Sequence, residues 1–234
     1  MALYRIADVV VKMSPSYEET AHWYEPYLTE EVVTPDYELT VSQEDIDYFV
    51  ENGLNITPAI AENMLLSSKF NRRLLKYFGA FIHSSALLFD GRVYLFSADS
   101  GVGKSTLTSR ICRLYPDRAS VINDDKPSIR MIDNKCIVYG TPFAGGTDKQ
   151  INTSAELGAV VFIERGDENE ISRIPSSMAI KLLLAQMHKP KTPAGNDRLL
   201  GILSQIIENY PFYLLKCTDS DEAVCVALEA TKQV

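Results

Sequence analysis

One segment constrains the fold of this chain more than any other. The residues Ala98–Ser105 read ADSGVGKS and follow the pattern A/G-x-x-x-x-G-K-S/T, with alanine where the strict form begins with glycine. Gly101 and Gly103 allow the backbone to wrap until successive N–H groups point at one anion. A helix that begins near Lys104 would add its positive end to that field. The pattern therefore predicts a strand, a phosphate-binding loop and a helix in succession.

Two side chains of this segment have expected chemical roles. Lys104 would reach the β- and γ-phosphates of a nucleotide as a mobile point charge, and the Ser105 hydroxyl would coordinate magnesium. We therefore expect ATP and Mg²⁺ as cofactors. A glycine-rich turn of purely structural use is the alternative. The residues expected to bind the nucleotide are Asp99, Ser100, Gly101, Val102, Gly103, Lys104, Ser105 and Thr106.

The composition of the chain argues against several other classes of protein. Its net charge of −8 argues against nucleic acid or an anionic membrane as the main partner, because both bind basic surfaces. No apolar run approaches the roughly 20 residues of a membrane span, and the N-terminus carries Arg5 and Asp8 where a signal peptide is apolar. The scattered cysteines and histidines give no zinc pattern and favour a cytoplasmic protein.

Apolar periodicity and turn residues predict an α/β fold. We expect a strand at 3–13 and a longer helix that Thr57 caps and Pro58 opens. Asp90-Gly91 predicts a tight hairpin whose second arm leads into the phosphate loop, and a second hairpin is expected around 133–135. Such hairpins make the sheet mixed rather than purely parallel. Further strands are expected at 119–122, 158–164, 170–174 and 212–217, and further helices at 42–52, 107–114, 177–187, 197–209 and 220–231.

The chain is expected to divide near residue 80. Residues 80–234 contain the phosphate loop and both hairpins, and we expect them to form a P-loop domain. Residues 1–79 are expected to be an N-terminal strand-plus-helix segment that packs on this domain or beside it. The outer face of its long helix is either solvated or contacts an acidic partner, because it carries Lys69, Arg72, Arg73 and Lys76.

Two adjacent carboxylates, Asp124 and Asp125, follow Lys104 by twenty and twenty-one residues, at the end of a short apolar strand. We expect one to hold magnesium with Ser105 and the other to accept a proton from an attacking hydroxyl or to orient that hydroxyl. A plain Asn-Asp-Asp turn between two strands is the alternative. The sequence has no L-S-G-G-Q signature and no N-K-x-D motif, so neither a transporter ATPase nor a GTPase is expected.

Four features occur in order along the chain: the run Ile-His-Ser-Ser at 82–85, the hairpin at 90–91, the phosphate loop, and Asn-Asp-Asp at 123–125. Together they resemble the catalytic core of HPr kinase/phosphorylase and its small relatives, over roughly residues 80–226. The resemblance implies the P-loop fold of the HPr kinase C-terminal domain and of ATP-type phosphoenolpyruvate carboxykinase. In that fold, which has a mixed sheet, an antiparallel hairpin leads into the phosphate loop. It also implies a homo-oligomer.

The resemblance also implies roles for individual residues. Asp124 is expected to be the catalytic base for the acceptor hydroxyl, and Asp125 the second magnesium ligand beside Ser105. Lys104 is expected to bind the phosphate that is transferred. His83, twenty-one residues before Lys104, is expected near the reacting phosphate and the aspartate. A structural histidine at the start of a strand is the alternative for this position.

The expected activity is transfer of the ATP γ-phosphate to a hydroxyl, with a serine of a protein or peptide as the acceptor. The first eighty residues are too short for the additional N-terminal domain of HPr kinase, and the family signature after the aspartates is not found. HPr itself and the reverse phosphorylase reaction are therefore not expected. The alternatives are a kinase of a small molecule such as free serine, and a non-catalytic ATP-binding sensor.

Three further segments are expected near the site. The loop 140–147 resembles the G-x-P-aromatic-x-G loop of the small relatives and would border the acceptor. Lys149 and Arg165 would either steady the charge of the γ-phosphate or be solvated. The basic, proline-containing run 188–193 would either close over the site or be an exposed linker.

Overall fold

A computed structural model describes residues 1–31, 33–53 and 55–232 of the chain. Within these residues, the strands form a three-stranded sheet near the N-terminus and a nine-stranded mixed sheet in the rest. The N-terminal elements are β1 (Ala2–Ile6), β2 (Val9–Met13), α1 (Glu18–Tyr24), η1 (Glu25–Tyr27), β3 (Tyr37–Glu38), α2 (Gln43–Glu51), α3 (Pro58–Leu74) and η2 (Leu75–Tyr77). The remaining elements are β4 (Gly79–Phe81), β5 (Ser85–Phe89), β6 (Arg92–Ser97), α4 (Lys104–Leu114), β7 (Ala119–Asn123), β8 (Ser128–Ile132), β9 (Lys135–Tyr139), β10 (Ser154–Arg165), β11 (Glu170–Arg173), α5 (Ser176–Ala185), α6 (Pro193–Asn209), β12 (Phe212–Cys217), α7 (Asp221–Ala227) and η3 (Leu228–Thr231).

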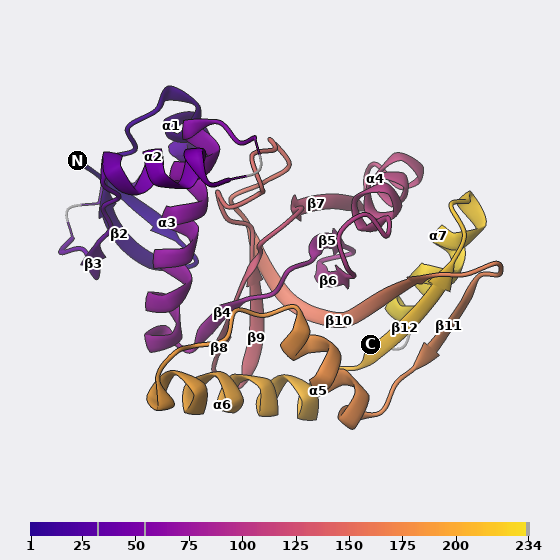
Figure 1. The fold of residues 1–234 in the computed structure, drawn as a ribbon. Helices are drawn as coiled ribbons and strands as arrows, with labels where there is room; N and C mark the ends of the chain where they lie inside the picture. The colour runs from indigo at the N-terminus through magenta and orange to yellow at the C-terminus, as the bar shows by residue number, and fades with distance from the viewer. Residues whose placement is uncertain (32, 54, 233–234) are drawn as a thin grey trace.

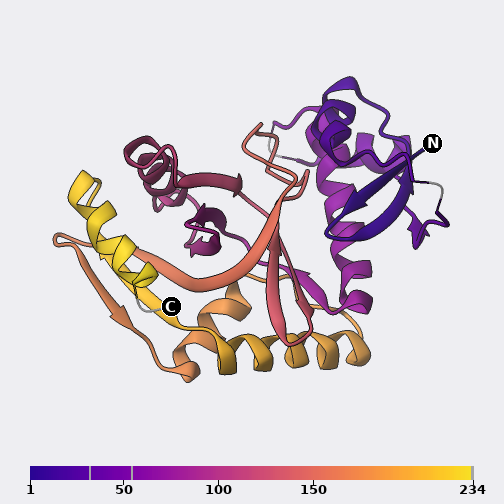
Figure 2. The same cartoon turned by 180° about the vertical axis from the view of Figure 1, so that it is seen from behind.

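The large sheet is organised around its longest strand, β10. Its strand order is β4-β8-β9-β10-β6-β5-β7, with β12 also paired to β10 and β11 paired to β12. The first residues of β10 pair with β9 in antiparallel fashion, and its later residues run parallel to β6 and β12. β10 curves as it passes between the two halves of the sheet (Figures 1 and 2). The fold is therefore mixed α/β with antiparallel hairpins, as predicted, whereas its assignment to one P-loop fold family stays a prediction.

Helices cover both faces of the central strands. Along β6, Val93 and Leu95 pack in one hydrophobic cluster with residues of α5 and α6, whereas Tyr94 and Phe96 pack in another with residues of α4 and α7. Strands that are buried on both faces have continuous apolar sequences rather than alternating ones. This explains the unbroken apolar run within β10.

Two tight turns close the predicted hairpins. Asp90 and Gly91 have φ angles of 48° and 82°, and Asp133 and Asn134 have φ angles of 48° and 62°. Positive φ at both central residues is the turn geometry that matches the twist of the flanking strands. The first hairpin, β5–β6, leads directly into the phosphate-loop segment, as predicted.

The N-terminal segment has more elements than predicted. Residues 3–13 form the β1–β2 hairpin instead of one strand, because Ala7 and Asp8 take φ angles of 49° and 56° and reverse the chain. The apolar pattern hid this turn, since alanine carries no turn signal. Neither α1 nor β3 was predicted. The start of α3 is confirmed: Pro58 is its first residue, and the Thr57 Oγ1 accepts the N–H of Ile60 at 3.3 Å.

Aromatic rings join the N-terminal segment to the rest of the molecule. The Phe143 ring centroid lies 5.3 Å from that of Phe70 in α3, 5.9 Å from that of Tyr24 in α1, and 5.3 Å from that of Phe81 in β4. Close aromatic pairs of this kind are worth about 0.5–1.5 kcal/mol beyond the area they bury. One hydrophobic cluster thus holds α1, α3 and the segment after β9 together.

Part of the basic face of α3 is engaged within the N-terminal segment. Lys69 Nζ donates to the Thr40 carbonyl at 2.7 Å, and the Arg73 guanidinium lies over the Tyr37 ring, 5.6 Å from its centroid.

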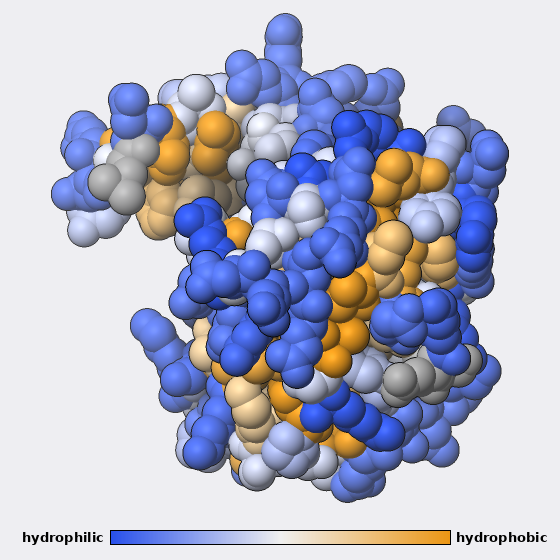
Figure 3. All heavy atoms as spheres, turned by 90° about the vertical axis from the view of Figure 1, so that its right-hand side faces the viewer, coloured by the Kyte–Doolittle hydropathy of each residue, from blue (hydrophilic) through white to orange (hydrophobic). Residues whose placement is uncertain are grey.

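On a different face of the molecule, Figure 3 shows hydrophilic residues around the outline and hydrophobic residues in a band between them. None of the helices that the structure describes is long and apolar enough to cross a membrane.

Candidate functional site

The phosphate-loop segment lies at an edge of the large sheet where several strands end. β6, β10 and β12 run parallel, and β7 has the same direction because both β6 and β7 are antiparallel to β5. The residues that follow these strands therefore gather at one edge, which is the usual ligand site of an open α/β sheet. They are Ala98, Asp124, Gly166 and Thr218.

Two loop glycines adopt a backbone conformation that other residues resist. Gly101 and Gly103 have φ angles of 80° and 122°. A Cβ at either position would meet none of the described atoms within 4 Å, so backbone conformation rather than space requires glycine. α4 begins at Lys104, which places the free N–H groups of its first turn next to the loop. The predicted succession of strand, loop and helix is confirmed.

Lys104 is folded back onto this loop. It is buried, and its Nζ donates to the Ala98 carbonyl at 2.8 Å. Burial lowers the pKa of Lys104, and the carboxylates of Asp125, Asp124 and Asp99 oppose that shift. The ammonium group therefore lies between the loop backbone and acidic side chains. The oxygen of a bound phosphate can replace the carbonyl as its partner.

A buried asparagine shapes the acidic turn after β7. The Asn123 Oδ1 accepts the backbone N–H of Asp125 at 2.9 Å and that of Lys126 at 2.7 Å. The Asn123 Nδ2 donates to the Thr141 carbonyl at 2.9 Å. One amide thus fixes the backbone around the two aspartates and ties it to the segment after β9. Sequence reasoning gave Asn123 no role of its own, because its full burial is visible only in the fold.

The two aspartates differ in their partners. The Asp124 side chain is 6% exposed, and its Oδ2 lies 3.6 Å from Lys149 Nζ. The other oxygen, Oδ1, is buried and has no hydrogen-bond partner among the described residues. Asp125 is engaged at both oxygens, with Oδ1 3.5 Å from His83 Nε2 and Oδ2 3.0 Å from Lys126 Nζ. Buried polar atoms are almost always paired, so Asp124 Oδ1 stands out at this site as one without a partner among the described residues.

A glutamine links His83 to the phosphate loop. The Gln186 Oε1 lies 3.0 Å from His83 Nδ1, and the Gln186 Nε2 donates to Asp99 Oδ1 at 3.2 Å. Because an amide oxygen only accepts, this arrangement assigns a proton to Nδ1. The His83 backbone N–H also donates to the Gln186 carbonyl, at 2.8 Å. Gln186 follows α5, far from the loop in sequence, and no local pattern indicated it.

The predicted magnesium ligands and the predicted base share a cavity. Ser105, Asp124 and Asp125 line a cavity of about 440 Å³, here called the carboxylate cavity, whose wall also includes residues 143–147. No group of three or more His, Cys, Asp or Glu side chains that could hold a metal is found among the described residues. Magnesium is usually held by one or two carboxylates plus substrate phosphates, not by a full protein cage. One hydroxyl and two carboxylates fit such an ion.

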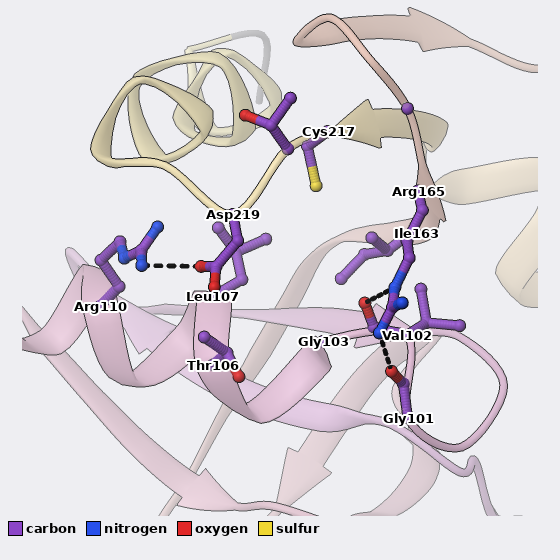
Figure 4. Close-up of a pocket in the computed structure, with 12 residues that line it drawn as sticks. Gly101, Val102, Gly103, Thr106, Leu107, Arg110, Ile163, Arg165, Cys217 and Asp219 are labelled. Carbon is purple, nitrogen blue, oxygen red and sulfur yellow. Dashed lines mark hydrogen bonds and ion pairs between the residues drawn. The ribbon is translucent and has the colours of Figure 1, made fainter.

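A second cavity, of about 520 Å³, also borders the phosphate loop. This strand-end cavity is lined by the loop residues 101–103, by Thr106, and by residues that follow β10 and β12. Figure 4 shows the ion pair between Arg110 and Asp219 on one side of it and Arg165 on the other. The Arg110 NH2 lies 2.7 Å from the Asp219 Oδ1. The volume of the strand-end cavity is within the range of about 300–1,000 Å³ that is typical of small-molecule sites.

The other predicted residues lie in three different settings. The Arg165 NH2 donates to the Gly101 carbonyl at 2.6 Å, so its guanidinium is held by the loop backbone (Figure 4). Lys149 is close to Asp124 and donates to Ser109 Oγ at 3.2 Å. Residues 188–192 lie in the connection between α5 and α6, and Pro193 is the first residue of α6. Of the expected nucleotide contacts, Asp99 and Ser100 are exposed, whereas Val102 and Thr106 line the strand-end cavity.

Comparison with solved structures shows a distant structural similarity. No family model matches the sequence, and no curated protein matches it. Among solved structures, the chain is similar to the Hpr(Ser) kinase/phosphatase from Coxiella burnetii, with 12% sequence identity and a TM-score of 0.38. The match covers 64% of this chain and 91% of that chain. Similarity at this level does not show membership of the HPr kinase family, which stays a prediction.

Proposed function

We propose that this protein is a magnesium-dependent phosphotransferase that moves the γ-phosphate of ATP to a hydroxyl, with a serine of a protein or peptide as the acceptor. The observation that carries the proposal is the position of Asp124: its side chain lines the cavity that Ser105 also lines, and its Oδ1 has no hydrogen-bond partner among the described residues. The negative charge of Asp124 also acts on Lys104, at the end of the glycine-rich loop. An acceptor hydroxyl would give the Asp124 carboxylate the partner that its Oδ1 lacks.

The donor would be held mainly by the loop and by Lys104. The loop N–H groups and the Lys104 ammonium would bind the β- and γ-phosphates, and the nucleoside would lie in the strand-end cavity. Ser105 and Asp125 would hold magnesium, which would supply positive charge to neutralise the phosphates. The Lys126 ammonium lies 3.0 Å from Asp125 Oδ2 and adds a positive charge to the carboxylate cavity.

The acceptor side would depend on Asp124. As the acceptor oxygen forms its bond to the γ-phosphorus, the bond from that phosphorus to the β–γ bridging oxygen breaks and its electrons leave with ADP. The hydroxyl proton passes to Asp124. Lys149, 3.6 Å from the other oxygen of Asp124, balances the charge of the carboxylate before the transfer. His83 contacts Asp125 and would hold this carboxylate, which is next to Asp124 in the sequence, in place.

The test is transfer of labelled γ-phosphate to a pool of peptides and small hydroxyl compounds. Asp124→Asn should lower turnover by roughly 10²–10⁴-fold while calorimetry still detects ATP binding, because only the base is lost. Lys104→Ala should lose both binding and transfer. Asp117→Asn, at an exposed aspartate after α4, is the matched control and should behave like the wild type. Wild-type transfer by the Asp124 and Lys104 variants would overturn the proposal.

The same assay separates the two alternative functions. Label that appears on free serine and not on peptides would indicate a small-molecule kinase. ATP binding without transfer to any hydroxyl would indicate a sensor protein.

A further inference from the structure

One wall of the carboxylate cavity comes from the N-terminal segment. Ile60, Met64 and Ser67, on successive turns of α3, line it opposite the residues 143–147. The contact between the two walls is close, because a Cβ on Gly146 would lie only 3.1 Å from the Ile60 side chain. The part of the molecule that lies outside the phosphate-binding sheet therefore shapes the space in front of Asp124.

The chemistry of this wall is apolar. Ile56, Ile60, Met64 and Phe143 contribute hydrocarbon surface to the cavity. Lys126 is its one lysine among the described residues, and the Lys126 ammonium lies 3.0 Å from Asp125. A free amino acid would bring both an ammonium and a carboxylate into this space. The one lysine of the cavity among the described residues is paired with Asp125, so the carboxylate of the amino acid would find no uncommitted cation. Burying an unpaired charge is expensive, so the cavity selects against a free carboxylate.

A further cavity continues from this one along α3. It has a volume of about 380 Å³ and shares Met64, Ser67 and Lys126 with the carboxylate cavity. Its other walls include the apolar side chains Phe49, Phe81 and Met187. Three shared wall residues make the two cavities neighbours, so a ligand with its hydroxyl at Asp124 can extend over Met64 into this α3 cavity.

We propose that α3 is the acceptor-recognition element and that the acceptor is a serine in an extended peptide segment. An uncharged, apolar side chain of that segment lies in the α3 cavity. The proposal rests on the proposed function and adds the element that recognises the acceptor and the type of side chain that this element selects. An extended chain advances about 3.3–3.6 Å per residue, so a side chain two positions from the serine reaches a neighbouring cavity while the serine stays at Asp124. A small metabolite would leave the α3 cavity unused.

Matched synthetic peptides test this inference on the full chain. Each peptide contains one serine, and the peptides are identical except for the residue two positions from that serine. This residue is leucine, aspartate or lysine, and free serine is the fourth acceptor. With ATP and magnesium, kcat/KM should be roughly tenfold or more higher for the leucine peptide than for the charged peptides and free serine, because an apolar pocket discriminates by that order.

A charge substitution makes the test specific to α3. Met64 is 37% exposed on its helix, so Met64→Glu is expected to fold, and it should raise the ratio of lysine-peptide to leucine-peptide kcat/KM by roughly tenfold. Leu200→Glu makes a like substitution at a 56% exposed position of α6 and should leave that ratio unchanged.

Three results would overturn the inference. They are equal kcat/KM for all peptides, a preference for free serine, and a peptide preference that Met64→Glu does not change. Each of them leaves phosphoryl transfer from ATP to a hydroxyl intact, and a preference for free serine would replace the peptide acceptor by a small molecule. Absence of transfer to every acceptor would instead overturn both.

Discussion

At the scale of single residues, Gly91 and Gly101 can be compared directly, because their backbone conformations are similar. Their φ angles are 82° and 80°, and at both positions a Cβ would meet none of the described atoms within 4 Å. Gly91 closes the β5–β6 hairpin, and Gly101 belongs to the phosphate loop. Because the left-handed conformation costs other residues roughly 1–2 kcal/mol, alanine should strain both sites to a similar extent.

We therefore predict that Gly91→Ala and Gly101→Ala each lower the free energy of unfolding by about 1–2 kcal/mol, as measured by urea titration. Only Gly101→Ala should also weaken ATP binding in calorimetry, because the loop must keep its N–H groups directed at the phosphates. Equal ATP affinity in the two variants would show that the loop conformation does not matter for the nucleotide.

At the scale of elements, the segment 140–147 depends on the helices that hold it. The Asn63 Nδ2 in α3 donates to the Pro142 carbonyl at 3.2 Å, and the Phe143 ring lies among aromatic rings from α1, α3 and β4. Asn123 ties the same segment to the acidic turn through the Thr141 carbonyl. The segment 140–147 and the two carboxylates are thus positioned by one network.

Phe143→Ala should lower the free energy of unfolding by about 3–5 kcal/mol, because Phe143 is 2% exposed and its loss leaves a cavity in the aromatic cluster. Phosphoryl transfer should fall more than ATP affinity, since the phosphate loop is in a different cluster. Tyr48→Ala, at a residue that is 66% exposed, is the control and should change stability by less than about 0.5 kcal/mol. A loss below about 1 kcal/mol for Phe143→Ala would mean that the ring does not anchor the segment.

At the scale of the whole molecule, the site lies where the curved sheet, α4 and the N-terminal segment meet. Three hydrophobic clusters pack around this meeting point. The acidic turn follows β7, the phosphate loop follows β6, and His83 precedes β5. A ligand that bridges these parts binds the folded chain and not the unfolded one. It should therefore raise the stability of the whole chain.

ATP with magnesium, at a concentration 100 times its Kd, should raise the free energy of unfolding by about 2.7 kcal/mol. For a chain of this size the midpoint of thermal unfolding should rise by roughly 5–10 °C. Chelation of magnesium should remove part of the shift, and Lys104→Ala should remove nearly all of it. A shift of the same size in Lys104→Ala would place the nucleotide elsewhere.

Local chemistry in the sequence determined the phosphate loop, both core hairpins and the acidic turn. In each of these, a few adjacent residues set the backbone conformation: Gly101 and Gly103 in the loop, and Asp90-Gly91 in the first hairpin. The same reasoning placed α3 from Thr57 and Pro58. It was wrong for residues 3–13, where Ala7 and Asp8 reverse the chain without a recognisable turn signal.

Only the tertiary structure decided which distant residues meet at the site. Gln186 reaches His83 and Asp99, and Met64 reaches the carboxylate cavity, because helices from both ends of the chain pack at the same sheet edge. Such contacts depend on long-range packing, which leaves no periodic or local mark in a single sequence. The same packing left Asp124 Oδ1 buried without a partner among the described residues, and the proposed chemistry begins at that atom.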